Sequence, residues 1–251
     1  MVKQDGSVWS TGSNAHGQLG DGTTSDRMAF VRVLVRGAEA VSAGVEHSMV
    51  LGRDGSVLVA GGNKFGQLGD GSTTSRLTFV EVLSSGAKAI AAGGYHSMVL
   101  KSDGSVWAMG YNVYGQLGDG SATTKTILQA ITISPMDLVD GGSTQAIAAG
   151  LFHSMVLQED GSVWGVGSNP SGQLGFGTSK GDVQHTVYVQ VVNPEARAVA
   201  VAAGYFHSMM LTSDGSFWAT GASNVGQLGD GSTIDKNIFV RVTKGTKRGG
   251  W

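Results

Sequence analysis

The chain has 251 residues, of which 41 are glycine, and its formal net charge is −2. Charged residues make up 14% of the chain and hydrophobic residues 41%, which excludes a disordered charged tail. The small net charge disfavours nucleic acid as a partner. The lack of cysteine excludes disulfides and cysteine-ligated zinc, and no apolar run is long enough for a transmembrane span. Since no signal peptide is evident either, we expect an intracellular location.

A repeat with a period of about 50 residues organises the whole chain. The tetrapeptide Gly-Gln-Leu-Gly begins at Gly17, Gly66, Gly115, Gly172 and Gly226, with spacings of 49, 49, 57 and 54 residues. A second element, Ala-Gly-x-x-His-Ser, carries the histidines His47, His96, His153 and His207. These copies predict a single repeat domain over residues 1–251, with units at approximately 1–43, 44–92, 93–149, 150–203 and 204–251.

The segment from residue 79 to residue 120 shows which elements the repeat favours. Residues 79–82 alternate in polarity as a strand does, and residues 89–93 and 96–100 hold small and β-favouring side chains. The pair Asp103-Gly104 then predicts a hairpin turn before Val106, and residues 110–120 form a glycine-rich loop. No unit contains a convincing amphipathic helix, so each unit is predicted to hold three or four short antiparallel strands.

Such units favour an all-β fold, a β-propeller of antiparallel blades with about five repeat units; a β-solenoid is the alternative architecture. The first Asp-Gly pair begins at Asp5, so the first unit lacks its Ala-Gly-x-x-His-Ser element and its blade is incomplete. We therefore expect a partial or five-bladed ring, and a fragment of a longer protein. Unless five blades close, the ring has exposed strand edges that invite pairing with another chain.

The motifs together resemble the regulator of chromosome condensation repeat. The resemblance rests on Ala-Gly-x-x-His-Ser, then Asp-Gly-Ser-Val-Trp, then Gly-x-Asn-x-x-Gly-Gln-Leu-Gly-Asp-Gly, and it covers essentially the whole chain. Some positions depart from the pattern: Leu58 replaces the tryptophan of the other units, Phe176 replaces an aspartate, and Ser223 replaces an asparagine. The resemblance implies a propeller, and members of this family resemble closed rings of seven blades.

The four repeated histidines invite a metal-binding interpretation, which their distribution opposes. Each lies in a different unit, whereas zinc ligands converge on one point. We predict that His47, His96, His153 and His207 are structural and hydrogen-bond the backbone within their blades. A Ser-His-Asp triad is disfavoured in the same way, because these residues recur in every unit and a catalytic constellation is singular. The sequence predicts no catalytic residue, no metal and no cofactor.

Positions that vary between units are better candidates for function. The pair before each repeated histidine holds Tyr95, Leu151, Phe152, Tyr205 and Phe206, which predicts an aromatic surface for a protein partner. The alternative is that these side chains plug the central channel. Insertions near residues 134–144 and 180–185 lengthen two units, and Met136, Asp137 and Leu138 are further candidates for partner binding.

The sequence therefore favours a non-enzymatic protein-interaction module or scaffold, such as a peripheral subunit of a larger assembly. The alternative is a guanine-nucleotide exchange factor for a small GTPase, an activity that the family resemblance implies. For the interaction module, the partner is a protein whose identity the sequence leaves open.

Overall fold

The computed structural model describes residues 1–34, 36–133, 143–177, 184–191 and 196–242. These residues form eighteen β-strands and no helix, so none of them lies in a helix that could cross a membrane. In chain order the strands are β1 (Val8–Gly12), β2 (Arg27–Leu34), β3 (Ala38–Ala43), β4 (His47–Gly52), β5 (Val57–Gly61), β6 (Arg76–Leu83), β7 (Ala87–Ala92), β8 (His96–Lys101), β9 (Val106–Gly110), β10 (Lys125–Ile131), β11 (Thr144–Ala149), β12 (His153–Gln158), β13 (Val163–Ser168), β14 (Gln184–Gln190), β15 (Ala198–Ala203), β16 (His207–Thr212), β17 (Phe217–Gly221) and β18 (Lys236–Arg241).

The strands form five antiparallel sheets, which are the blades of a propeller. Blade 1 has two strands, β1 and β2, and the other blades have four each: blade 2 (β3–β6), blade 3 (β7–β10), blade 4 (β11–β14) and blade 5 (β15–β18). Each four-stranded blade begins one strand before the corresponding repeat unit, because the Gly-x-x-His turn joins its first and second strands. Consecutive repeat units therefore share a blade.

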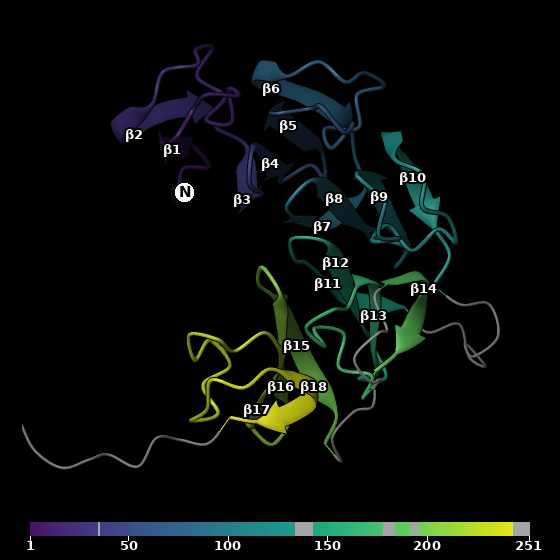
Figure 1. Cartoon of the computed structure of the whole chain (residues 1–251). Helices are drawn as coiled ribbons and strands as arrows, with labels where there is room; N and C mark the ends of the chain where they lie inside the picture. Colours follow the sequence, from purple (N-terminus) through teal and green to yellow (C-terminus); the bar gives the residue numbers. More distant parts are fainter. Residues whose placement is uncertain (35, 134–142, 178–183, 192–195, 243–251) are drawn as a thin grey trace, which may run out of the picture.

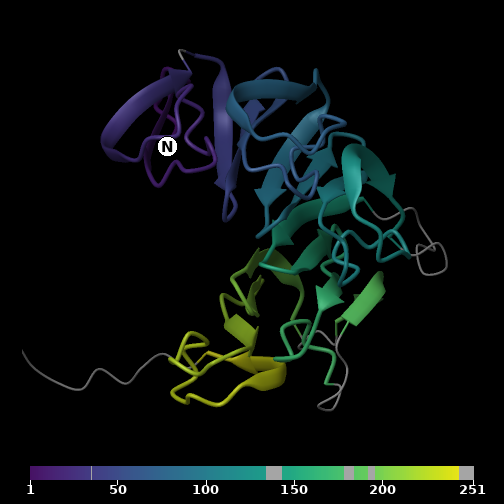
Figure 2. The ribbon, with the colours of Figure 1, turned by 45° about the horizontal axis from the view of Figure 1, so that its top comes forward.

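The blades follow one another along an open arc (Figure 1). The innermost strands lie side by side in the order β3, β7, β11 and β15, and they surround the axis. Blade 1 and blade 5 stand at the two ends of the arc and do not meet in either view (Figure 2). No ladder of the described residues joins them, so the structure is a partial ring.

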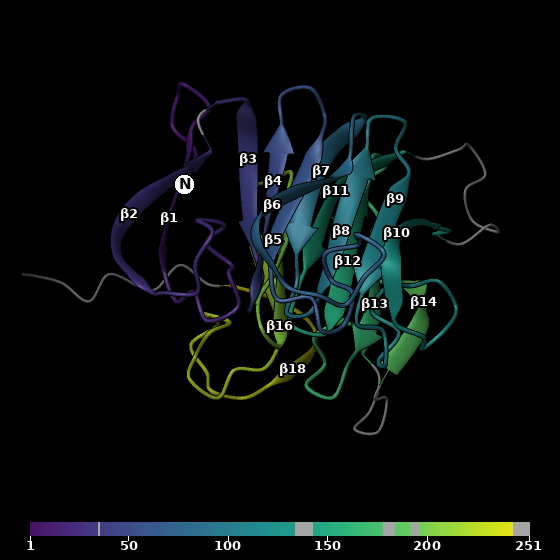
Figure 3. The same cartoon turned by 90° about the horizontal axis from the view of Figure 1, so that it is seen from above.

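Burial differs between the inner and outer strands of a blade. The second strands of blades 3 and 4 read His-Ser-Met-Val-Leu and are buried on both faces, because a blade packs against each side of the sheet. The outermost strands β6 and β10 instead consist of half-buried and exposed residues apart from the buried Ile131, since one edge meets solvent. The strands run through the thickness of the ring, which leaves their connections on two opposite faces (Figure 3).

The predicted insertions fall mostly outside the described residues. Met136, Asp137 and Leu138 lie there, as do residues 180–183. Their part in partner binding therefore stays a prediction.

Candidate functional site

The repeated histidines join neighbouring blades. His47 on β4 hydrogen-bonds Ser97 on β8 (Nε2 to Oγ, 2.9 Å), and Ser97 donates its hydroxyl proton to the carbonyl oxygen of Gln67 at 2.8 Å. His96 makes the same bond to Ser154, which donates to the carbonyl of Gln116. The predicted bond from each imidazole to the backbone of its own blade is not found among the described residues: the imidazole instead bonds a serine hydroxyl of the next blade, and that hydroxyl donates to a backbone carbonyl.

This arrangement determines which ring nitrogen carries the proton. A serine hydroxyl has one hydrogen, and because Ser97 gives it to Gln67, its oxygen must accept from Nε2–H of His47. The Nδ1 atoms of His47, His96 and His153 are buried without a hydrogen-bond partner among the described residues. Burial therefore lowers the pKa of His47 to about 4 and that of His96 and of His153 to about 3. The interior histidines are neutral hydrogen-bond donors at physiological pH.

A buried asparagine shapes the glycine-rich loop of four blades, and Ser223 takes its place in blade 5. In blade 3 the Asn112 side chain accepts a bond from the Leu117 amide at 2.9 Å and donates to Asp119 Oδ1 at 3.0 Å. Asp119 in turn forms an ion pair with Lys125, 3.1 Å away. The loop must also pass Gly110 in a left-handed conformation (φ 107°), which glycine adopts without strain. These contacts hold the loop that carries Tyr111 and Tyr114 on the surface.

Five aromatic rings from blades 2, 3 and 4 meet on this face, and we name them the aromatic patch: Phe65, Tyr95, Tyr111, Tyr114 and Phe152. Ring centroids are 5.4 Å apart for Phe65 and Tyr95, 6.1 Å for Tyr95 and Phe152, and 5.0 Å for Tyr114 and Phe152. All five side chains are half-buried. The patch is therefore continuous across two blade junctions.

The patch follows a rule that holds at three of the blade junctions. The residue before Gly-Gln-Leu-Gly in one blade contacts the residue before the repeated histidine in the next, as Phe65 contacts Tyr95 and Tyr114 contacts Phe152. Between blades 1 and 2 the same two positions hold a polar pair, with His16 Nε2 at 3.4 Å from Glu46 Oε1. The framework thus provides equivalent junction sites, and side-chain chemistry differs among them.

The two residues of each pair before the histidine have different positions. The first lines the axial channel, which has a volume of about 250 Å³ and includes Val45, Gly94 and Leu151. The second, such as Tyr95 or Phe152, packs against the loop of the preceding blade. Leu151 departs from the expectation of an exposed contact, because it is only 6% exposed and packs beside Gly94.

Tyr205 and Phe206 form a second aromatic pair on blade 5, with ring centroids 5.5 Å apart. Tyr205 is 56% exposed, and Phe206 is half-buried.

Burial raises the pKa of Tyr95, with smaller contributions from the nearby Glu46 charge and from Tyr205. Burial likewise raises the pKa of Tyr111, with a smaller effect of Tyr114. These phenols of the patch stay neutral at physiological pH and can donate hydrogen bonds.

Sequence reasoning identified Tyr95 and Phe152 but missed Phe65, Tyr111 and Tyr114. These three residues occupy variable positions of the Gly-x-Asn-x-x-Gly loop. Variation between repeat units, the criterion applied to the pair before the histidine, would therefore have found them as well. Among the described residues no group of three or more histidine, aspartate or glutamate side chains could hold a metal ion.

Residues 1–248 match the family described as the RCC1-like domain. The chain belongs to this family. The four-stranded blades, the His-Ser junctions and the glycine-rich loops described above are thus features of an RCC1-like domain.

Curated relatives match the RCC1-like chain over short segments. The human X-linked retinitis pigmentosa GTPase regulator is 38% identical over 93 residues, which cover 37% of this chain and 9% of that protein. The ultraviolet-B receptor of Arabidopsis thaliana is 34% identical over 93 residues, covering 37% of this chain and 20% of the receptor. The chain therefore matches only a small part of the length of either relative.

Solved structures show the same fold over nearly the whole chain. Human WBSCR16 superposes with a TM-score of 0.83 at 24% identity, covering 96% of this chain and 63% of that one. Prp20p from Saccharomyces cerevisiae, whose crystal structure is described together with its binding to Gsp1p and histones, gives a TM-score of 0.82 at 20% identity and coverages of 97% and 60%. The RCC1-like chain thus spans about three fifths of each of these proteins.

Proposed function

We propose that this RCC1-like domain is a non-enzymatic protein-interaction module that binds a protein partner through the aromatic patch. The carrying observation is the run of five half-buried rings across three blades. Aromatic side chains are enriched among the residues that contribute most to binding energy, because they bury a large area with little loss of conformational entropy. Tyr205 and Phe206 extend this surface across the channel opening.

The chemistry of the patch supports a protein partner over a small charged ligand. Glu46 and Lys64 lie at its margin, while its centre consists of Tyr95, Tyr114 and Phe152. An apolar centre with phenol donors and a charged rim is the usual composition of a protein interface.

Affinity capture from native lysate tests the proposal. The test variant carries Tyr95→Ala, Tyr114→Ala and Phe152→Ala, and the control carries Phe217→Ala, an exposed aromatic at the start of β17, on the opposite face. We expect one partner to be recovered in stoichiometric amounts by the wild type and the control and to be lost with the test variant, since each contributing aromatic is worth about 2 kcal/mol. Equal recovery by a folded test variant would remove the patch from the interface.

A small GTPase is the second candidate partner, with guanine-nucleotide exchange as the activity. It is favoured by the human relative's designation as a GTPase regulator and by the description of Prp20p binding to Gsp1p. The discriminating measurement is release of a fluorescent guanine nucleotide from a panel of purified small GTPases. Faster release with the wild type, lost in the aromatic variant, would support exchange, whereas unchanged release from all of them counts against it.

A further inference from the structure

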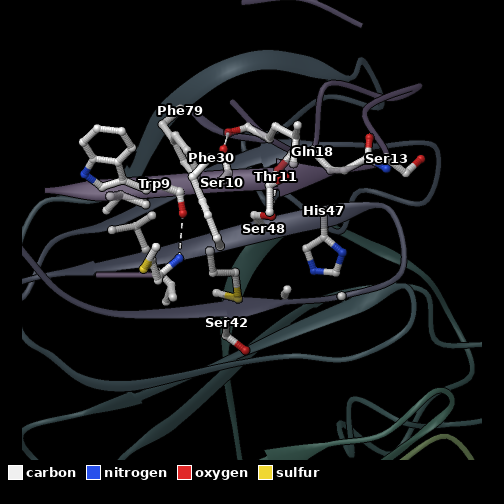
Figure 4. Close-up of a pocket in the computed structure, with 18 of the residues that line it drawn as sticks. Trp9, Ser10, Thr11, Ser13, Gln18, Phe30, Ser42, His47, Ser48 and Phe79 are labelled. Atoms are coloured by element: carbon white, nitrogen blue, oxygen red, sulfur yellow. Dashed lines mark hydrogen bonds between the residues drawn. The ribbon is translucent and has the colours of Figure 1, made fainter. Parts of the chain in front are cut away.

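Glu46 is the one acidic residue among the four that directly precede the repeated histidines; the other three are Tyr95, Phe152 and Phe206. The loop of blade 1 lies over the start of β4, beside a pocket that Gln18, His47 and Ser48 line (Figure 4). Ser48 donates its hydroxyl proton to the carbonyl of Gln18 at 2.7 Å, and the same packing brings His16 to within 3.4 Å of Glu46. Glu46 therefore lies at a junction whose contacting loop and strand both belong to the described residues.

Among the described residues no lysine or arginine balances the carboxylate of Glu46. Aspartates of the glycine-rich loops each pair with such a cation: Asp21 with Arg27, Asp70 with Arg76, Asp119 with Lys125 and Asp230 with Lys236. The nearest ionisable contact of Glu46 is His16 Nε2 at 3.4 Å, which is longer than the roughly 2.7–2.9 Å of a charge-assisted hydrogen bond. The Glu46 side chain is 30% exposed, so its carboxylate can accept a cation from a bound molecule.

The backbone next to Glu46 carries no side chain. Blade 3 has Tyr111 at this position, and its amide donates to the carbonyl of Tyr95. Blade 2 has Gly62 there, and its amide donates to the carbonyl of Glu46 in the same way. A Cβ at Gly62 would stand 3.3 Å from Oε2 of Glu46, so the carboxylate lies directly over bare backbone. The place that the Tyr111 ring fills in blade 3 therefore holds no ring in blade 2.

Aromatic side chains border this place from both neighbouring blades. In blade 3 the centroid of the Tyr111 ring lies 4.8 Å from that of Phe65 in the preceding blade and 5.9 Å from that of Phe152 in the following blade. The repeat puts His16 and Tyr95 at the equivalent positions on the two sides of the place in blade 2. A flat group of about the size of a phenol ring fits between such neighbours.

The electrostatics of the place favour a cation. Burial raises the pKa of Tyr95 and the Glu46 charge adds to the rise, so the carboxylate acts on that ring. The faces of aromatic rings are themselves negative, and the Lys64 Nζ atom already lies 5.3 Å from the centroid of the Phe65 ring. A guanidinium group is flat, stacks on aromatic faces and forms two parallel bonds to a carboxylate, whereas an ammonium group does not.

We propose that the protein partner of the aromatic patch presents an arginine whose guanidinium pairs with Glu46 and lies against the Tyr95 ring, in the place left open by Gly62. This inference rests on the proposed function, because it names the side chain by which the patch recognises its partner. The centre of the patch is apolar, so the residues that flank this arginine in the partner are apolar. The partner segment is thus defined by one essential cation within an apolar sequence.

The probes are three blocked tripeptides with leucine at both ends and arginine, lysine or citrulline in the middle. They are titrated into the isotope-labelled 251-residue chain, and the amide NMR signals of Glu46, Gly62 and Tyr95 are followed. We expect saturable shifts with the arginine peptide and about tenfold weaker binding of the citrulline peptide, which has the same shape without the charge. Glu46→Gln should weaken binding of the arginine peptide about tenfold, and Gly62→Tyr should abolish it, because the new ring would fill the place as Tyr111 does in blade 3. Glu81→Gln is the matched control, since it removes an exposed carboxylate on β6 of the same blade, and it should leave the affinity unchanged.

Equal affinity of the arginine and citrulline peptides, wild-type affinity of Glu46→Gln, or the absence of saturable binding would overturn the proposal. Equal affinity of the lysine peptide would overturn the choice of a guanidinium. Affinity capture with Glu46→Gln separates this proposal from the proposed function. Loss of the partner with the variant of Tyr95, Tyr114 and Phe152 but full recovery with Glu46→Gln would mean that the patch is the interface and the arginine assignment is wrong. Equal recovery by every variant would instead remove the interface itself.

Discussion

The His-Ser junction leads to a prediction about stability for which another copy of the repeat supplies the control. His96 and His207 are the same residue at the same repeat position, but His96 is fully buried and bonded to Ser154 at 2.9 Å. The His207 side chain is half-buried and has no hydrogen-bond partner among the described residues, because blade 5 is the last blade that they form. Replacing each by alanine therefore compares an interior junction with an end of the arc in one molecule.

We expect His96→Ala to cost about 3–4 kcal/mol and His207→Ala about 1 kcal/mol. For His96, about 1 kcal/mol comes from the hydrogen bond and the rest from the cavity that the imidazole leaves in a closely packed interface. For His207, only part of the burial is lost and no bond is broken.

Urea unfolding followed by circular dichroism at pH 7.5 measures both effects. Ser154→Ala and the double variant His96→Ala/Ser154→Ala complete a thermodynamic cycle, in which the double variant should lose less than the sum of the single variants. Equal losses for His96→Ala and His207→Ala, or strict additivity in the cycle, would refute the junction as the source of stability.

Three further predictions concern pH, a glycine and an asparagine. The buried histidines have pKa values of about 3 to 4, whereas an unfolded histidine has a pKa of about 6.5. As the pH falls below about 6.5 the unfolded chain therefore binds protons that the folded chain does not. The free energy of unfolding, measured from urea midpoints, should decrease by about 2 kcal/mol per buried histidine between pH 7.5 and 5. Gly110→Ala should cost about 2–3 kcal/mol in thermal unfolding, because the new Cβ would stand 2.6 Å from the Tyr95 carbonyl oxygen at a φ of 107°. Asn112→Ala should cost about 3 kcal/mol by urea unfolding, because it leaves the buried Leu117 amide without an acceptor and removes a donor to Asp119. A loss below about 1 kcal/mol would show that water replaces the side chain.

Local motifs predicted the strands, the hairpin turns and the propeller, because each is encoded by neighbouring residues and repeated in every unit. The Asp103-Gly104 turn and the strand 96–100 were found where the sequence placed them. The incomplete first blade also followed from the position of Asp5. What the motifs left undetermined was the partner of each polar side chain, since one repeat unit does not show which surface of the next blade it meets.

Tertiary structure decided the histidine bonds and the aromatic patch. His47 and Ser97 lie 50 residues apart, and only the packing of one blade on the next brings the imidazole to the hydroxyl. Phe65 and Tyr95 likewise meet at a blade junction, and the first residue of each variable pair turns into the channel while the second faces the loops. The repeat determines the blades, whereas the contacts between blades depend on the radial geometry that stacks them, and the candidate binding surfaces arise at those contacts.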